Sequence, residues 1–157
     1  MAESTPSLDK VDIKILKVLA EDGRISWRDL ADQVGLSVTP VLRRVKALED
    51  DGLIRGYSAD LDEPRLGGSL SIFVQVSLEK QEADALARFE EEISLIPQVM
   101  SCFLMTGDYD YQLRVVMPNL QAFHLFLTTK LATIPGVANV KSSFALKSVL
   151  LRKSPLF

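Results

Sequence analysis

The sequence has very few of the residues that disulfide bonding, metal binding or catalysis most often use. Its 157 residues include one cysteine, Cys102, and one histidine, His124. A single cysteine cannot form a disulfide within the chain, which favours a reducing compartment such as the cytoplasm. No apolar run approaches the ~18 residues that cross a bilayer, and the opening MAESTPS has no secretory-signal pattern. We therefore expect a cytoplasmic protein without a membrane segment.

An excess of positive charge is also absent. The net charge is −3, and residues 1–60 carry 9 Lys/Arg against 11 Asp/Glu. This balance argues against non-specific binding of nucleic acid, which depends on a broad positive field. A focused basic patch that binds DNA at one site remains compatible with this charge balance.

Residues 8–60 predict three helices. Apolar residues recur at helical spacing in the first, which ends before Gly23. The second covers residues 27–34, and the third runs from Ser37 to about Asp51. Two short helices joined by a glycine-containing turn form the outline of a helix-turn-helix. On spacing alone this unit could bind DNA or could be a packing module.

The pattern changes after the third helix. Residues 53–64 alternate briefly and then break up, which predicts a strand or wing followed by a linker. Pro64, Gly67 and Gly68 mark the boundary. We expect a DNA-binding domain over residues 1–60, a linker over 61–69, and an effector-binding and oligomerisation domain over 70–157.

The second half predicts strand, helix, strand, strand, helix, strand, which is the ferredoxin-like βαββαβ order. Both helices would cover one face of an antiparallel sheet, so the other face or a strand edge needs a partner. We therefore expect a homo-oligomer. The predicted strands are 70–78, 99–105, 111–117 and 137–151, and the predicted helices are 82–96 and 119–133.

The third helix has two different sides at about 100° per residue. One side holds Val38, Val41, Val45 and Leu48, and the opposite arc holds Thr39, Arg43 and Lys46, flanked by Leu42 and Arg44. Arginine can bind guanine, methyl groups can meet thymine, and lysine can neutralise phosphate. The alternative is a solvated face, which exposed Leu42 does not favour.

The start of the second helix can add contacts to the DNA backbone through its amides and side chains. Trp27 there could instead pack against the first helix. The candidate DNA-binding residues are Ser26, Trp27, Arg28, Ser37, Thr39, Pro40, Leu42, Arg43, Arg44 and Lys46.

Residues 106–111, TGDYDY, place two carboxylates beside a glycine. Catalysis would need a second acid–base group or a nucleophile. His124 lies near the apolar stripe of its helix, where we expect a core or interface residue, and Cys102 has no nearby partner for a metal. We therefore expect no catalytic residue, no metal site and no cofactor.

The same segment suits a free amino acid. Backbone N–H groups of a glycine-containing loop can bind a carboxylate, and an aspartate can accept from an ammonium group. An ordinary hairpin turn explains Gly107 and Asp108 equally well. The residues alone leave both interpretations open.

The chain resembles transcription regulators of the leucine-responsive/asparagine-responsive (Lrp/AsnC, "feast/famine") family over nearly its whole length. The resemblance rests on the order of LDKVDIKILKVLAEDGRIS, LADQVGLSVTPVLRRVKALEDDGLIRGY, TGDYDYQLRV and IPGV. It implies an α+β protein, with an N-terminal winged helix-turn-helix and a C-terminal ferredoxin-like regulatory domain. It also implies dimers, assembled further into tetramers or octamers, and amino-acid effectors bound between regulatory domains.

The resemblance favours a ligand role for the TGDYDY segment. Polar Ser142 and Ser143, which match the start of the family's last strand, could contribute from a neighbouring subunit. The candidate effector-binding residues are Thr106, Gly107, Asp108, Tyr109, Asp110, Ser142 and Ser143.

The sequence thus predicts a sequence-specific regulator that binds double-stranded DNA. An amino-acid effector would change the arrangement or number of dimers and so the number of helices that reach DNA. Two alternatives remain: an amino-acid-sensing module that acts on a protein partner without DNA, and a small enzyme. The exposed arc of the third helix argues against the first alternative, and the missing acid–base groups argue against the second.

Overall fold

The computed structural model describes residues 8–152, which fall into two compact units. The first contains the residues up to Asp60 together with those from Leu150, and the second is Leu61–Val149. No helix within residues 8–152 combines the length and apolar character that a membrane crossing needs.

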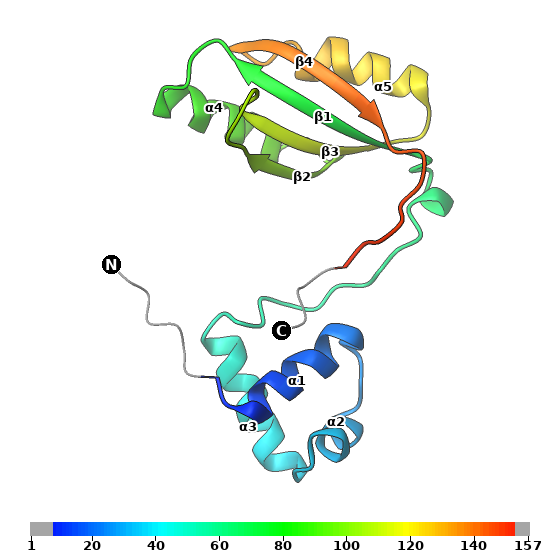
Figure 1. Cartoon of the computed structure of the whole chain (residues 1–157). Coiled ribbons are helices and arrows are strands. Elements are labelled where there is room, and N and C mark those ends of the chain that lie inside the picture. Colours follow the sequence, from blue (N-terminus) through cyan, green and yellow to red (C-terminus); the bar gives the residue numbers. More distant parts are fainter. Residues whose placement is uncertain (1–7, 153–157) are drawn as a thin grey trace. The chain divides into compact units, whose positions relative to one another are not determined.

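The N-terminal unit contains three helices, α1 (Lys10–Glu21), α2 (Trp27–Val34) and α3 (Val38–Asp50) (Figure 1). Their starts follow from local chemistry. Asp9 caps α1 by accepting hydrogen bonds from the backbone N–H groups of Val11 and Asp12. Apolar side chains from all three helices form one core, which comprises Ile15, Leu30, Ala31, Val34, Val41, Val45 and Leu48.

The strand predicted after α3 is wrong. Residues 53–60 form no strand, and the only strands in the described chain belong to the second unit, so no ladder partner exists beside this segment. Side chains hold it instead. The Tyr57 hydroxyl donates to Glu49 Oε1 at 2.9 Å, and the Tyr57 ring lies against Gly23.

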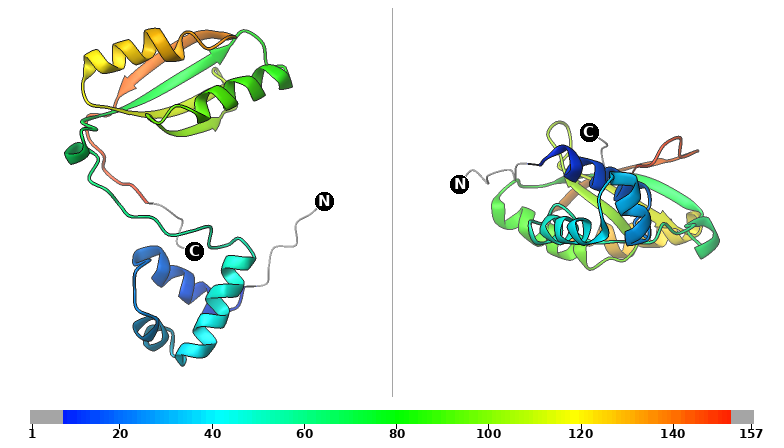
Figure 2. Two further views of the ribbon diagram at one scale, coloured as in Figure 1. Left: turned by 180° about the vertical axis from the view of Figure 1, so that it is seen from behind. Right: turned by 90° about the horizontal axis from the view of Figure 1, so that it is seen from below.

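The second unit has the predicted order of strands and helices (Figures 1 and 2). All neighbouring strands are antiparallel, in the order β2-β3-β1-β4. A π-helical turn, Leu127–Leu131, continues α5. The elements are β1 (Leu70–Leu78), α4 (Ala83–Ser94), β2 (Val99–Leu104), β3 (Tyr111–Met117), α5 (Leu120–Phe126) and β4 (Val137–Phe144).

Both helices lie on the same face of the sheet, as the view from behind in Figure 2 shows. The alternating pattern of β1 and β3 explains the core. Ile72 pairs with Val115 and Val74 with Leu113, and all four side chains are fully buried. The structure therefore confirms the α+β fold, with one sheet face that neither helix covers.

The last strand is shorter than predicted. It ends at Phe144 rather than 151, because its partner β1 begins at Leu70. Phe144 pairs with Ile72, and the Ala145 N–H donates to the Ser71 carbonyl, after which only Leu70 of β1 remains. Strand length here depends on the neighbour rather than on the strand's own sequence.

The segment predicted to be a linker makes contacts within the second unit. Glu63, which precedes a short 3₁₀ turn (Pro64–Leu66), forms a two-point ion pair with Arg114 of β3. A Cβ added to Gly68 would lie 2.4 Å from Val116 Cγ1. This close approach packs the segment against the uncovered face of the sheet.

Candidate functional site

Helix α3 presents a mixed polar and apolar arc to solvent. Thr39, Arg43 and Lys46 are exposed, and Leu42 keeps 40% of its surface accessible. Val41, Val45 and Leu48 on the opposite side are buried in the core. Val38, which the helical wheel placed with the buried side, is 37% exposed, because it opens the helix where less of the core surrounds it.

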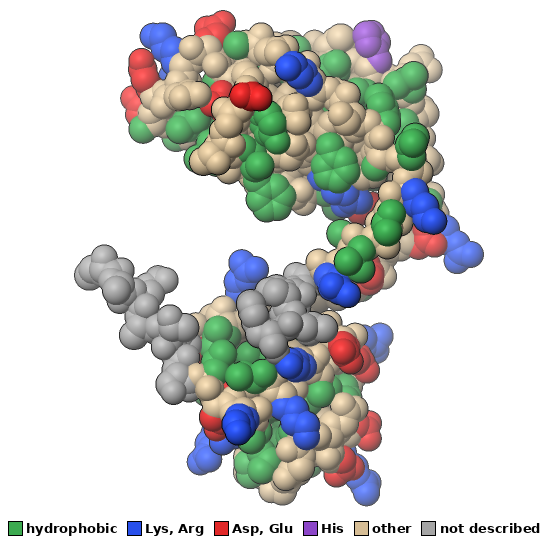
Figure 3. All heavy atoms as spheres, viewed as in Figure 1, with side chains coloured by type: hydrophobic (Ala, Val, Ile, Leu, Met, Phe, Trp, Pro, Cys, Tyr) green, Lys and Arg blue, Asp and Glu red, His purple; other side chains and the backbone are tan. Residues whose placement is uncertain are grey.

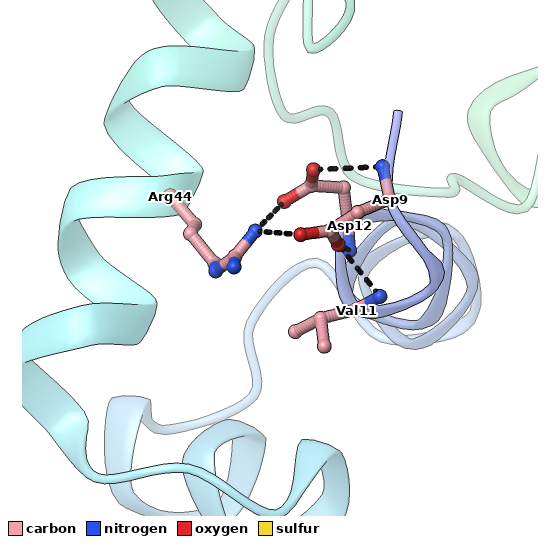
Figure 4. A network of polar contacts seen from close by, with 4 residues as sticks. All are labelled: Asp9, Val11, Asp12 and Arg44. Atoms are coloured by element: carbon pink, nitrogen blue, oxygen red, sulfur yellow. Dashed lines mark hydrogen bonds and ion pairs between the residues drawn. The ribbon is translucent and has the colours of Figure 1, made fainter. Parts of the chain in front are cut away.

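Arg44 is engaged inside the N-terminal unit (Figure 4). Its Nη1 donates to Asp9 Oδ2 and to Asp12 Oδ1, each at 2.7 Å. The Asp12 backbone N–H and the Arg44 guanidinium lower the pKa of Asp9. The guanidinium predicted to contact DNA thus joins α3 to the start of α1, and two carboxylates already neutralise its charge.

The start of α2 is solvent-facing. Ser26 accepts the Asp29 backbone N–H at 3.1 Å and donates its hydroxyl to the Asp29 carboxylate at 2.6 Å. Trp27 is 44% exposed and Arg28 is also exposed, so the indole is not buried against α1. Among the remaining candidates, Ser37 is exposed and Pro40 is half-buried.

These side chains all belong to the helix-turn-helix. Lysine and arginine side chains are visible on the face of this unit seen in Figure 3. Exposed cations and exposed apolar groups on one helix are the combination that base-edge and phosphate contacts require. The arrangement can place one short helix against a DNA groove.

The TGDYDY segment forms the turn between β2 and β3. The Met105 N–H donates to the Asp110 carbonyl at 2.8 Å and closes the hairpin. Gly107 has φ +130°, a conformation that other residues rarely adopt. Thr106, Gly107 and Asp108 are exposed, whereas Tyr109 is half-buried.

Asp110 differs from the rest of the hairpin because it is only 7% exposed. Its Oδ2 accepts the Leu78 backbone N–H and its Oδ1 accepts Nε2 of Gln81, both at 2.7 Å. No local spacing indicates the contact with Gln81, which lies 29 residues earlier in the chain. Asp108 is therefore the aspartate of the hairpin that faces solvent.

Within one chain, Ser142 and Ser143 do not join the hairpin. They pair with Val74 and Phe73 of β1, whereas the hairpin borders Val76. They also lie near the end of β4, so their predicted place at the start of the last strand is wrong. Any contribution to the same effector site would come from a second copy.

A cavity of about 190 Å³ lies between α4 and the β2–β3 pair. Its lining residues are Glu90, Ile93, Ser94, Cys102, Leu104 and Tyr111. Burial and a 2.7 Å hydrogen bond from the Tyr111 hydroxyl to Glu90 Oε1 raise the pKa of Tyr111. Burial, with a smaller effect from Glu90, raises the pKa of Cys102 to about 11.

His124 is exposed on α5, so a core position for it is wrong. The apolar stripe of α5 is carried by Phe123 and Phe126, which are buried. An interface role stays a prediction.

Comparison with known proteins identifies both units. A family model described as "Winged helix-turn-helix DNA-binding" matches residues 8–55. A second, described as "Lrp/AsnC ligand binding domain", matches residues 71–155. The two matches follow one another in the chain, in agreement with the two units.

Relatives that match nearly the whole chain support the same family. The chain is 64% identical over 148 residues to a Bkd operon transcriptional regulator from Pseudomonas aeruginosa, covering 94% of this chain and 97% of the relative. It is 37% identical over 142 residues to the leucine-responsive regulatory protein of Escherichia coli, covering 90% and 87% respectively.

A solved structure of a Neisseria meningitidis transcriptional regulator in complex with L-Met superposes with a TM-score of 0.90. The two sequences are 40% identical, and the match covers 95% of this chain and 96% of that one. These relatives are regulators rather than enzymes. The chain accordingly belongs to the Lrp/AsnC family of transcriptional regulators, and it is a DNA-binding regulator that responds to a small-molecule effector.

Proposed function

We propose that the exposed face of α3 reads the operator and that an L-amino acid bound at the β2–β3 hairpin changes this reading. One observation carries the DNA part of the proposal. Thr39, Leu42, Arg43 and Lys46 share one exposed arc, while the opposite side of the same helix fills the core. A helix fixed in this way presents its base-reading side chains without further ordering.

Each residue of the arc has a distinct task in this proposal. Arg43 donates to guanine in the major groove, and Leu42 and the methyl group of Thr39 contact thymine methyls. Lys46 neutralises phosphate. Ser26, Trp27, Arg28, Ser37 and Pro40 lie at helix starts, where amides and side chains meet the DNA backbone.

Residues 1–60 would thus bind DNA, and residues 70–157 would bind the effector and a second subunit. The segment 61–69 joins the two. Because the protein acts on DNA, we also propose that it works in the cytoplasm.

At the effector site, free backbone N–H groups around Gly107 bind the carboxylate of the amino acid. Exposed Asp108 accepts from the ammonium group. L-leucine and L-methionine are the first effectors to test, because relatives are named leucine-responsive and one solved relative is an L-Met complex. Ser142 and Ser143 of a second copy complete the site.

A second copy also explains the uncovered sheet face. Phe73 and Phe103 point away from the helices and are 43% and 59% exposed. Figure 3 shows hydrophobic side chains on this face of the unit. Pairing two such faces would bury them and create a dimer, and dimers could assemble into tetramers or octamers.

A dimer places two α3 helices on half-sites about one helical turn apart. An effector that shifts the dimers changes how many helices meet DNA together. Effector and operator must then change each other's affinity by the same factor.

Fluorescence anisotropy with a labelled fragment of the gene's upstream region tests the proposal. We expect saturable binding that weakens with salt, and L-leucine or L-methionine should change the apparent Kd severalfold. Glycine serves as the control amino acid without a side chain. Salt-independent or absent binding to this DNA and to a random-sequence pool would contradict the DNA-reading role. Unchanged binding with every L-amino acid would contradict the effector role alone.

A further inference from the structure

Asp110 is the one charged side chain that is buried among the residues the structure describes. Both of its carboxylate oxygens are occupied. Oδ2 accepts the Leu78 N–H and Oδ1 accepts Nε2 of Gln81, each at 2.7 Å. Buried carboxylates are stable only when donors replace the water they lose, and here the protein supplies those donors.

These contacts join three separate parts of the chain. Leu78 is the last residue of β1, and Gln81 lies in the loop before α4. Asp110 is the last residue of the turn before β3. The Asp110 N–H also donates to the Val76 carbonyl at 2.9 Å, and the Asp110 carbonyl accepts the Met105 N–H. The backbone and side chain of Asp110 therefore both fix the position of the hairpin.

We propose that Asp110 and Gln81 form a latch that positions the effector-binding hairpin, and that Asp110 does not bind the effector itself. Gln81 is then a positioning residue of the effector site, although it contacts no effector. The ammonium group of the amino acid pairs with Asp108, which is exposed on the same turn. This inference rests on the proposed effector function of the hairpin.

The burial of Asp110 and the exposure of Asp108 favour a structural role for Asp110 and an effector-binding role for Asp108. Asp110 would have to lose the Leu78 or Gln81 donor, or admit the ligand to a site with 7% exposure, before it could contact an ammonium group. Asp108 needs neither change. The two aspartates of one turn thus serve different purposes, one structural and one for recognition.

Two isosteric substitutions and their combination separate the latch from a charge that binds the effector. In Asp110→Asn the amide oxygen can accept from Leu78 and the NH₂ can donate to the oxygen of a rotated Gln81 side chain. Both hydrogen bonds remain and only the charge is lost. Gln81→Glu instead places one carboxylate against another. Combining the two substitutions restores a donor facing an acceptor.

Hydrogen exchange of the hairpin amides measures the latch without any effector. Gln81→Glu removes a hydrogen bond to a charged group, so exchange of these amides should rise ~10-fold or more. The double variant should return exchange to near the wild-type rate. Gln121→Glu is the matched control, because exposed Gln121 makes no side-chain hydrogen bond to other described residues.

Calorimetric titration with L-leucine and L-methionine measures the consequence for binding. Gln81→Glu should weaken binding ~10-fold or more for the same reason, and the double variant and Asp110→Asn should bind within severalfold of wild type. DNA affinity without amino acid should not change in Gln81→Glu, and thermal unfolding confirms that each variant folds.

Unchanged hairpin exchange in Gln81→Glu would overturn the latch. So would an Asp110→Asn variant that protects its hairpin normally yet no longer binds the amino acid, because the charge itself would then be required. If the wild type binds neither amino acid, the proposed effector role fails, and the exchange data still decide whether the latch exists.

Discussion

Nη1 of Arg44 lies 2.7 Å from Oδ1 of Asp12, and it also lies 2.7 Å from Oδ2 of Asp9. This contact joins the DNA-facing helix α3 to the capped start of α1. The arginine that follows Arg43 in sequence therefore holds the helix-turn-helix together, while its neighbour faces solvent. Two adjacent arginines have different surroundings because they lie about 100° apart on the helix.

Replacing Arg44 should affect stability more than DNA binding. Arg44→Met leaves Asp9 and Asp12 without their cation, so the thermal midpoint of the N-terminal unit should fall by a few degrees at low salt. The loss should be smaller in high salt, because added salt already screens an exposed ion pair. Circular dichroism at two salt concentrations measures this. A variant of unchanged stability whose DNA binding depends less on salt would show that Arg44 contacts phosphate instead.

Replacing Lys46 should affect DNA binding more than stability. A lysine that neutralises one phosphate contributes ~0.9 to the slope of log K against log salt. Lys46→Met should therefore reduce the slope by about that amount per subunit bound and leave the thermal midpoint unchanged. Lys17→Met, an exposed lysine on α1, is the matched control. Equal slopes for both variants and wild type would remove Lys46 from the interface.

Gly68 should tolerate no side chain while Val116 is present. A methyl group there would meet Val116 Cγ1 at 2.4 Å, and such overpacking typically costs ~1–3 kcal/mol. Urea unfolding should show this loss for Gly68→Ala. In a Val116→Ala background the same substitution should cost clearly less, because the clashing methyl is gone. Additive effects of the two changes would exclude this contact as the cause.

Cys102 should react slowly with alkylating reagents at neutral pH. Burial, helped by Glu90, raises its pKa from 9.0 to about 11, and the thiolate is the reactive form. The iodoacetamide rate should rise through about pH 11, and Glu90→Gln should lower that midpoint slightly. Because the folded pKa is the higher one, this thiol contributes stability below pH 9 that is lost as the pH rises toward 11. A midpoint near 9 would contradict the burial of this thiol.

The sequence predicted the elements whose cause is local. The bounds of β1 and β3 agree with the predicted 70–78 and 111–117, because alternating apolar residues define a strand with one buried face. The bounds of α2 agree with the predicted 27–34, since the Ser26 hydroxyl, three residues before Asp29, caps the helix within its own turn.

Features that depend on distant partners were missed or misplaced. The end of β4 lies near the start of β1, and the Asp110 carboxylate accepts a hydrogen bond from Gln81 of a distant loop. Arg44 flanks the DNA-facing arc, and no spacing in the sequence indicates its ion pairs with Asp9 and Asp12. In each case the deciding contact joins residues far apart in sequence, for which one sequence provides no spacing rule.

The reading of DNA by α3 is tested most directly by selecting bound sites from a random DNA library with wild type and with Arg43→Ala. We expect a symmetric site whose half-sites lie about one helical turn apart. Arg43→Ala should lose ~1–3 kcal/mol of preference for guanine at one symmetry-related pair of positions and keep the rest of the site. An identical site for both proteins, with the same preference at every position, would contradict the account.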